Sequence, residues 1–447
     1  MQKGTKTVIR MDNTRHISDP FGLITLENIL SQANMLAALK RVEANKGAPG
    51  IDGMETTQLR EHLFLHPGEL SSAIRNGTYK PSPVKRVSIP KPERGKYRDL
   101  GIPTVIDRLV QQAITQVMSD AFDFTFSSNS FGFRPNRGAH DAIYRCVGNC
   151  DDGYCYAVDM DLSKFFDTVN HSRLIRKLDS HIKDKRVISL IHKILTAGVC
   201  IDSRVEKSEI GLPQGGPLSP LLANIYLDEL DKLLEKRGHR FARYADDIVI
   251  QCRSRRAAER TLANVCKYVE GKMLLKVNRE KTSVAFITQG IKFLGYGFWR
   301  DRKTKRIIPS VHQKSRIRLK DALRIVLARN LKCSLEEVKR KLKVKLSGWA
   351  NYFSLAPDKS WRNRMDEWIR HRIRMILWKT WKRIRTRYRA LCQAGVQEVE
   401  AWKQANTRKG YWRSTNTPIV NEALDPKFLA KHHWCWLSLM TKPLEWK

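Results

Sequence analysis

Two adjacent aspartates in an apolar stretch, Phe241-Ala-Arg-Tyr-Ala-Asp-Asp-Ile-Val-Ile250, place the strongest constraint on how this chain can fold. The residues on either side of the pair predict two strands joined by a tight turn. Successive strand side chains point to opposite faces, so Asp246 and Asp247 can approach one site only near that turn. Two carboxylates that close repel each other unless a cation joins them, and Mg²⁺ binds carboxylate oxygens together with substrate phosphates. The stretch therefore predicts a cation-binding hairpin, with a solvated Asp-Asp turn as the common alternative.

Three further stretches favour the cation site over the solvated turn. In Tyr154-Cys-Tyr-Ala-Val-Asp-Met-Asp-Leu-Ser-Lys-Phe-Phe-Asp167, the alternation of residues predicts a strand with Asp159 and Asp161 on one face. The glycines of Gly211-Leu-Pro-Gln-Gly-Gly-Pro-Leu-Ser-Pro220 let a backbone approach a ligand closely, and its Ser-Pro end suits an N-cap and the first helical position. The third stretch is Phe131-Gly-Phe-Arg-Pro135.

In this order, the four stretches resemble the palm of a reverse transcriptase, and in detail that of a group II intron-encoded reverse transcriptase/maturase. The resemblance extends from about residue 20 to near the C-terminus. It implies an α+β right-hand polymerase fold with fingers, palm and a helical thumb, followed by a small C-terminal helical DNA-binding region. The implied domains are a basic N-terminal tail over 1–19, fingers and palm over 20–300, a thumb or maturase-specific domain over 301–385, and the DNA-binding region over 386–447.

The resemblance assigns the catalytic centre to Asp161, Asp246 and Asp247, which would bind two Mg²⁺ ions. One ion would activate the 3′-hydroxyl of a primer, and the other would hold the incoming triphosphate and its leaving group. The backbone carbonyl oxygen of Leu162, next to Asp161, is a further predicted metal ligand. Because Asp161 and Asp246 are 85 positions apart, only a folded domain can bring them together.

A spacing of five residues distinguishes the two aspartates of the predicted strand. Polymerases that the chain resembles place a metal-binding aspartate five residues before an aromatic residue, and Asp161 precedes Phe166 by five. Asp161 is therefore favoured over Asp159. The side chain of Phe166 would then press on the 2′ position of an incoming sugar and exclude ribonucleotides by steric clash. Phe165 is the alternative at this position and has the character of a core residue.

Four further residues resemble those that contact the nucleotide in this family, namely Lys91, Arg98, Gln214 and Lys281. Lys91 and Arg98 would neutralise the triphosphate, but a solvated basic hairpin is the alternative and neighbouring cations leave the identity of Arg98 open. Gln214 would touch the template or the nascent base pair, or else face solvent in a turn. Lys281 would be a general acid toward the leaving pyrophosphate, or else a solvated lysine. Arg134 would contact the template or the aspartates, or else serve only the fold.

Apolar residues at helical spacing predict helices on both sides of the palm pattern. Residues 26–42 are predicted to form one amphipathic helix, whose inward stripe is Ile29, Leu30, Ala33, Leu36 and Ala37. Residues 108–118 are predicted to form a second helix. After residue 309 the pattern is again helical, and one apolar face there is crowded by cations that would grip a nucleic-acid backbone: Arg370, Arg372, Arg374, Lys379, Lys382, Arg383, Arg385, Arg387 and Arg389.

The charge of the chain indicates a polyanionic partner. The formal net charge is +37, and residues 301–447 contribute 36 Lys and Arg against 12 Asp and Glu, a net +24. All eleven Trp lie at or after Trp299, so the last third combines cations with aromatic rings that can stack on bases, although a Trp-rich core is the simpler interpretation for most of them. The resemblance makes the expected partners a group II intron RNA, an RNA template/DNA primer duplex, target DNA and dNTPs.

Two segments of the last third carry the rest of the resemblance. Leu346-Ser-Gly-Trp-Ala-Asn-Tyr-Phe353 resembles the maturase-specific thumb, and Ala405-Asn-Thr-Arg-Lys-Gly-Tyr-Trp412 resembles the C-terminal DNA-binding region. No endonuclease pattern of paired CxxC and His follows. The compact form therefore resembles the bacterial class C lineage, which implies insertion into accessible single-stranded DNA.

The expected function is RNA-directed DNA polymerisation that copies intron RNA into DNA for retrohoming, together with maturase assistance to splicing. Two alternatives remain open: a domesticated intron-like reverse transcriptase in DNA repair or phage defence, and a splicing factor that only binds RNA. The nine Cys form no paired pattern, which suggests a reducing cytosol, and no apolar run reaches transmembrane length. We expect a bacterial cytoplasmic protein that makes no membrane contact and joins the nucleoid when it is on DNA.

Overall fold

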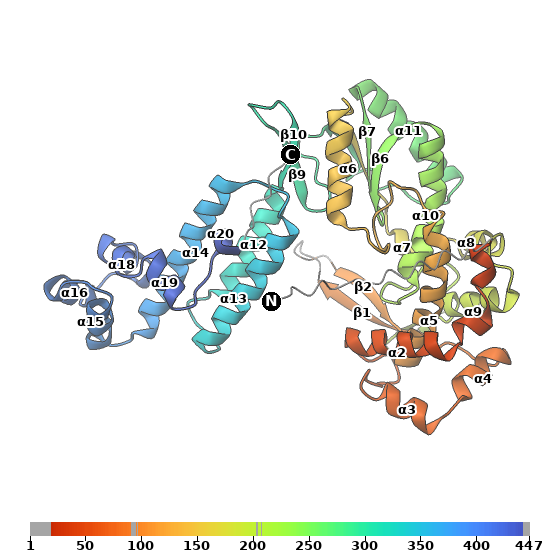
Figure 1. Cartoon of the computed structure of the whole chain (residues 1–447), viewed down its shortest axis with the longest axis horizontal. Helices are drawn as coiled ribbons and strands as arrows, with labels where there is room; N and C mark the ends of the chain where they lie inside the picture. The colour runs from red at the N-terminus through yellow and green to blue at the C-terminus, as the bar shows by residue number, and fades with distance from the viewer. Residues whose placement is uncertain (1–18, 91–94, 96, 203, 207, 441–447) are drawn as a thin grey trace, which may run out of the picture. The chain divides into compact units, whose positions relative to one another are not determined.

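The computed structural model describes residues 19–90, 95, 97–202, 204–206 and 208–440 (Figure 1). Of the predicted tail over 1–19, only Asp19 is among them. The chain divides into two compact units. The first unit contains the described residues up to Gly138 together with Met160–Ile248 and Thr261–Thr282, and the second contains Ala139–Asp159, Val249–Arg260 and the described residues from Ser283.

The N-terminal part of the first unit is helical, with a short 3-10 helix, Pro20–Leu23, before the first α-helix. The helices there are α1 (Leu26–Ile29), α2 (Gln32–Asn45), α3 (Leu59–Leu65), α4 (Glu69–Arg75) and α5 (Val105–Asp123). Helix α5 contains the helix predicted over 108–118, and α2 packs along it. Thr104 caps α5, because its hydroxyl accepts the Asp107 N–H (3.2 Å) and donates to the Asp107 carboxylate (2.6 Å).

The single helix predicted over residues 26–42 is wrong. The chain leaves α1 at Leu30, and the Ser31 hydroxyl then caps the new helix α2. The interruption changes the rotational phase, so Ile29 and Leu30 are buried as predicted but Leu36 is 47% exposed. The same interruption leaves Ala33 and Ala37 exposed and brings Ala38, Leu39 and Val42 into the core instead.

Two four-stranded sheets follow. The first has the order β2-β1-β4-β5. Strand β1 (Val84–Pro90) is antiparallel to β2 (Tyr97–Ile102) and parallel to β4 (Val199–Ile201). Strand β5 (Arg204–Glu206) lies at the edge beyond β4. The second sheet has the order β6-β7-β3-β8. Its strands are β3 (Tyr156–Asp161), β6 (Arg240–Tyr244), β7 (Asp247–Cys252) and β8 (Ser283–Phe286).

The helices between these strands are α6 (Ala139–Asp151), α7 (Phe165–Thr168), α8 (His171–Asp179), α9 (Lys185–Leu195), α10 (Ser219–Lys236) and α11 (Arg255–Gly271). The buried residues of helix α10 are mainly apolar but include Asn224 and Asp231, and the helix packs against α5, α8 and β6. It begins at Ser219, so the cap is Leu218 and not the predicted Ser219. The Ser219 hydroxyl instead donates to the Pro213 carbonyl oxygen at 2.6 Å and holds the glycine-rich segment against the start of the helix.

The second unit contains an antiparallel pair of strands, β9 (Tyr296–Arg300) and β10 (Ile307–Val311), followed by helices. The helices are α12 (Gln313–Val326), α13 (Leu335–Tyr352), α14 (Lys359–Thr380), α15 (Ile384–Gln393), α16 (Glu398–Ala405), α17 (Tyr411–Ser414), α18 (Pro418–Ala423), α19 (Pro426–Lys431) and α20 (Leu437–Met440). Leu342, Ile369 and Trp378 are at the centre of their common core. The helical pattern predicted after residue 309 is confirmed. Within the described residues, no helix is long and apolar enough to cross a membrane.

Candidate catalytic site and nucleic-acid surface

The predicted hairpin is present, and its turn consists of Ala245 and Asp246 between β6 and β7. Ala245 has φ +57°, a conformation that a residue other than glycine seldom adopts. Gly132, in the stretch from 131 to 135, lies directly beneath this turn. A Cβ atom on Gly132 would be 2.5 Å from the Ala245 nitrogen, which is closer than any side chain allows. The backbone of the 131–135 stretch therefore packs against the turn that carries the two aspartates.

Asp161 is the last residue of β3, the strand that neighbours β7 in the sheet. Its backbone carbonyl oxygen accepts the Asn278 N–H at 2.8 Å, and its carboxylate accepts the Asn278 side-chain amide at 3.0 Å. The Lys281 ammonium is 3.4 Å from the same carboxylate. Lys281, predicted from the sequence as a general acid toward pyrophosphate, is exposed and lies beside Asp161. Asn278 was not singled out, although it lies three residues before Lys281.

Asp246 and Asp161 act on each other electrostatically in the fold. Burial raises the pKa of the Asp246 carboxyl above its ordinary value, and the negative charge of Asp161 raises it further. The hydrogen bond from the backbone N–H of Asp246 opposes this rise in the pKa most, and the cations Arg98 and Arg243 oppose it less. Two carboxylates 85 positions apart in the sequence, and the strand residue Arg98, therefore share one neighbourhood. Asp247 is half-buried at the first position of β7.

The donor chemistry of this neighbourhood fits a hard divalent cation. Asp161, Asp246 and Asp247 offer carboxylate oxygens, and like charges that are brought together in a partly buried place are stabilised by a cation. Across the described part of the chain, no three or more His, Cys, Asp or Glu side chains are already gathered at metal-binding range. The Asp161 carboxylate is instead held by Asn278 and Lys281. Leu162 is buried and bridges to Val277.

Of the two cations predicted to hold a triphosphate, Arg98 lies in β2 opposite Ile89 of β1 and its side chain is exposed. Lys91 lies outside the described residues. The electrostatic effect of Arg98 on Asp246 connects the β1–β2 hairpin to the aspartates. The nucleotide role of Arg98 therefore stays a prediction, beside the alternative of a solvated basic hairpin.

Gln214 is half-buried and does not simply face solvent. Its backbone carbonyl oxygen accepts the Gly101 N–H at 2.7 Å. Its side-chain amide donates to the Asp167 carboxylate at 3.5 Å. The next residue, Gly215, has φ +125°, and a Cβ there would be 2.7 Å from the Gly101 carbonyl oxygen. The close approach that Gly215 allows here is to the backbone of β2, whereas the sequence predicted an approach to a ligand.

Phe165 and Phe166 have different environments. Phe165 is 2% exposed and packs edge-on against Tyr226, as expected of a core residue. Phe166 is half-buried, and its carbonyl oxygen accepts the Leu212 N–H at 2.5 Å. Of the two rings, that of Phe166 is therefore the more exposed.

Arg134 serves the fold. Its guanidinium donates to the Asp123 carboxylate at 2.6 Å and to the carbonyl oxygens of Ser127 and Ser130 at 2.6 and 3.0 Å. The side chain is 3% exposed. Of the two predicted interpretations, the structural one is the one that these contacts support.

The predicted basic surface of residues 370–389 is partly wrong. Arg374 is buried and donates to the Leu424 carbonyl oxygen (2.9 Å), and Arg372 donates to the Leu327 carbonyl oxygen (2.8 Å). Carbonyl groups at the ends of helices need donors, and the guanidinium fork supplies several at once. The cations of this set that remain exposed are Lys382, Arg383, Arg385 and Arg389, and Arg370 is half-buried with its guanidinium over the Trp436 ring.

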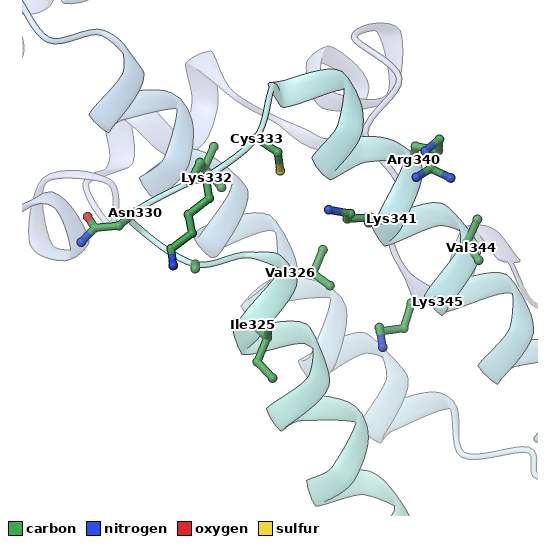
Figure 2. Close-up of a pocket in the computed structure, with 11 residues that line it drawn as sticks. Ile325, Val326, Asn330, Lys332, Cys333, Arg340, Lys341, Val344 and Lys345 are labelled. Atoms are coloured by element: carbon green, nitrogen blue, oxygen red, sulfur yellow. The ribbon is translucent and has the colours of Figure 1, made fainter. Parts of the chain in front are cut away.

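A groove of about 780 Å³ lies between the end of α12, the loop that follows it, and residues 340–345 of α13 (Figure 2). Ile325 and Val344 are 79% and 65% exposed along it, and Lys341 and Lys345 line the α13 side. Its other lining residues are Val326, Ala328, Asn330, Leu331, Lys332, Cys333 and Arg340, so the described lining contains apolar and cationic side chains but no acid. The groove suits a ligand with negative charge and apolar surface.

Two family models match this chain. "Reverse transcriptase (RNA-dependent DNA polymerase)" matches residues 89–298, and "Group II intron, maturase-specific domain" matches residues 317–395. The first match contains Asp161, Asp246 and Asp247, and the second contains α13, α14 and the groove's α13 side.

Among curated proteins, Protein YkfC of Escherichia coli (strain K12) is 31% identical over 333 residues, which is 65% of this chain and 87% of that protein. Group II intron-encoded protein LtrA of Lactococcus lactis is 34% identical over 248 residues, 54% of this chain and 40% of that protein. Among solved structures, the "Partial Cas6-RT-Cas1--Cas2 complex" is similar at a TM-score of 0.36 and 26% identity, over 55% of this chain and 42% of that one. The chain therefore spans most of YkfC but less than half of LtrA.

Proposed function

This chain belongs to the group II intron reverse transcriptase/maturase family, and from that premise we propose that it extends a DNA primer on an RNA template at Asp161, Asp246 and Asp247. It has the α+β right-hand polymerase fold. It combines a reverse transcriptase (RNA-directed DNA polymerase) domain with a maturase-specific domain. The observation that carries the proposal is geometric: Asp161 ends β3, the neighbour of β7 in the sheet, and Asp246 lies in the turn that leads directly into β7.

The three aspartates would hold two Mg²⁺ ions, with the Leu162 carbonyl oxygen as a further ligand. Bound divalent cations promote the attack of a primer 3′-hydroxyl on a triphosphate and stabilise the leaving group. Lys281 holds its ammonium at the edge of this site, 3.4 Å from the Asp161 carboxylate. We assign it the proton that the leaving pyrophosphate takes up.

The incoming dNTP would be bound from two sides. Arg98, in β2, together with Lys91 would neutralise its phosphates. Phe166 would exclude ribonucleotides by clash with the 2′-hydroxyl, since its ring, unlike that of Phe165, is not part of the core. Gln214 would contact the template or the new base pair from the segment that packs against β2.

The second proposed role is assistance to splicing. It is supported by the match of residues 317–395 to the maturase-specific domain and by the exposed cations in this region. The proposed partners are a group II intron RNA, the RNA template/DNA primer duplex and target DNA. The proposed domains are a tail over 1–19, fingers and palm over 20–300, thumb over 301–385 and a DNA-binding region over 386–447. We place this work, retrohoming included, in the bacterial cytoplasm and on the nucleoid.

Primer extension by an Asp246→Asn variant tests the polymerase assignment. With an RNA template, a DNA primer, Mg²⁺ and dNTPs, we expect extension to fall by more than about 100-fold, beyond what the loss of an outer partner of a metal site costs. RNA binding should remain, because the substitution removes one negative charge and no cation. Asp179→Asn, in an exposed ion pair with Lys185, is the matched control and should extend the primer normally.

Extension that survives Asp246→Asn would refute the assignment of the site. An intact chain that binds RNA and assists splicing but extends no primer would favour the splicing-factor alternative.

A further inference from the structure

Arg243, two residues before Ala245 in the hairpin, is completely buried beneath the proposed catalytic turn. We propose that Arg243 is a positioning residue that holds the Ala245–Asp246 peptide in place and so directs the Asp246 carboxylate toward the cation site. The inference rests on the proposed function, because it gives the turn a purpose. It adds a residue that touches neither the nucleotide nor the cations.

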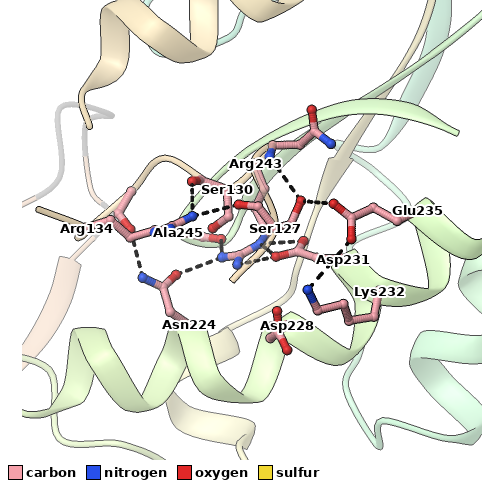
Figure 3. Close-up of polar contacts among 12 residues, drawn as sticks. Ser127, Ser130, Arg134, Asn224, Asp228, Asp231, Lys232, Glu235, Arg243 and Ala245 are labelled. Atoms are coloured by element: carbon pink, nitrogen blue, oxygen red, sulfur yellow. Dashed lines mark hydrogen bonds and ion pairs between the residues drawn. The ribbon is translucent and has the colours of Figure 1, made fainter. Parts of the chain in front are cut away.

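The guanidinium of Arg243 uses its three nitrogens on two different elements (Figure 3). Nε and Nη2 donate to the Asp231 carboxylate of α10, at 2.8 and 2.5 Å. Nη1 donates to the Asn224 side-chain oxygen of the same helix at 2.9 Å, and to the Ala245 carbonyl oxygen at 3.0 Å. The Ala245 carbonyl belongs to the peptide bond that leads into Asp246. One rigid planar group therefore connects α10 to that peptide.

The same turn is also fixed from the side of residues 129–132. The Arg243 N–H donates to the Asn129 carbonyl oxygen, and the Phe131 N–H donates to the Arg243 carbonyl oxygen, both at 2.9 Å. The Asn224 side-chain amide donates to the Gly132 carbonyl oxygen at 2.8 Å. Asn224 therefore contacts both the Arg243 guanidinium and the 129–132 segment. Ala245 keeps its unfavourable φ of +57° within this frame. Such a conformation persists only where the surroundings over-determine it.

The contacts of Arg243 differ from those of an arginine that only stabilises the fold. A buried ion pair by itself is weak support for stability, since apolar residues of similar volume often replace it without loss. Arg243–Asp231 would fall under that rule but for the bond to Ala245, which an apolar side chain cannot make. Arg134, also buried nearby, bonds to Asp123, Ser127 and Ser130 and to no atom of the turn.

The test compares Arg243→Lys with Arg374→Lys. A lysine at 243 keeps the charge for Asp231 but has one nitrogen in place of three, so it cannot also hold Asn224 and Ala245. Mn²⁺ binding to the full chain, followed by electron paramagnetic resonance, should weaken by about 10- to 100-fold in Arg243→Lys, the usual cost of an outer partner of a metal site. The affinity for a primer–template duplex should not change. Arg374→Lys, which alters a buried arginine bonded to Leu424 and Asn421 in the second unit, should bind Mn²⁺ like the parent.

An Arg243→Lys chain that binds Mn²⁺ normally while its melting temperature falls would overturn the proposal, because Arg243 would then be only structural. Should Arg243→Lys fail to fold, the double variant Arg243→Met, Asp231→Leu removes both buried charges together. This variant should fold and still bind Mn²⁺ weakly, and normal Mn²⁺ binding by it would overturn the proposal as well. An intact chain that binds Mn²⁺ but extends no primer would defeat the proposed polymerase function, and the Mn²⁺ comparison would still decide the role of Arg243.

Discussion

At the scale of single residues, the site places a carboxyl group where its charge is disfavoured. Asp246 loses water on burial, and Asp161 adds a second negative charge nearby. The backbone N–H of Asp246, Arg98 and Arg243 return part of the lost stabilisation but do not cancel it, because the pKa of Asp246 remains raised. A cation between the carboxylates would supply the stabilisation that is still missing. The aspartates that would bind this cation therefore destabilise the protein when the cation is absent.

The pKa of Asp246 makes stability depend on pH. Because the folded pKa lies above the unfolded one, the folded chain binds more protons between the two values, and stability falls as pH rises through the folded pKa. Asparagine cannot ionise, so Asp246→Asn should remove this loss. In a metal-free buffer, we expect the melting temperature of Asp246→Asn to exceed that of the parent at neutral pH. The difference should shrink as pH is lowered to where Asp246 is protonated, and a difference independent of pH would contradict this interpretation.

At the scale of elements, the β6–β7 turn depends on a segment more than a hundred residues earlier in the chain. Gly132 leaves no room for a side chain against Ala245, and Asn224 of α10 binds the Gly132 carbonyl oxygen. The hairpin, the 131–135 stretch and α10 are therefore one packed block. A change in any of the three should be felt at Asp246.

Gly132→Ala tests this packing. The added methyl group would meet the Ala245 nitrogen at 2.5 Å, and backbone atoms cannot move aside as a flexible side chain can. We expect a loss of about 1–3 kcal/mol in the free energy of unfolding, the usual cost of overpacking, together with slower primer extension. Gly148→Ala in α6 is the control, since no atom lies within 4 Å of its new methyl group. It should gain about 0.5–1 kcal/mol from the reduced freedom of the unfolded chain, as measured by urea denaturation.

At the scale of the whole molecule, the chain carries many more positive charges than its internal contacts neutralise or bind. The net charge is +37, and residues 301–447 contribute +24 of it, as 36 minus 12. Some of these cations are consumed internally, as Arg372 and Arg374 show by binding carbonyl oxygens. The exposed remainder is available for phosphates, and binding through it releases counterions.

Salt titrations separate the two kinds of arginine. Removal of the exposed Arg385 by Arg385→Gln should lower the slope of log affinity against log salt for an RNA duplex by about one, with the melting temperature unchanged. Arg374→Gln should leave the slope unchanged and cost about 1–3 kcal/mol of stability, because it breaks buried hydrogen bonds to Leu424 and Asn421. Equal slopes for Arg385→Gln and the parent would mean that α15 does not contact the RNA.

Local pattern alone was enough for the elements whose signals lie within a few residues. The run around Asp246 and Asp247 predicted a strand, a turn and a strand, and residues 108–118 predicted part of α5. The pattern over 26–42 failed because Ser31 can cap a new helix as readily as it can continue one, and packing against α5 decided between them. The predicted N-cap at Ser219 was wrong by one residue for a similar reason, because the Ser219 hydroxyl donates to the Pro213 carbonyl oxygen instead.

The sequence by itself determined the chemistry of this protein: which residues can ionise, where the aspartate pair turns and how strongly the chain attracts a polyanion. Only the tertiary structure decided which groups meet. It brought Asp161 to Asp246 across 85 positions, placed Lys281 and Asn278 on Asp161, and gave Arg243 its hold on Ala245. It also buried Arg374, which a count of charges had placed on the surface. The reason is that a buried carbonyl or carboxylate must find its partner in space, and distance along the chain carries no information about which partner that is.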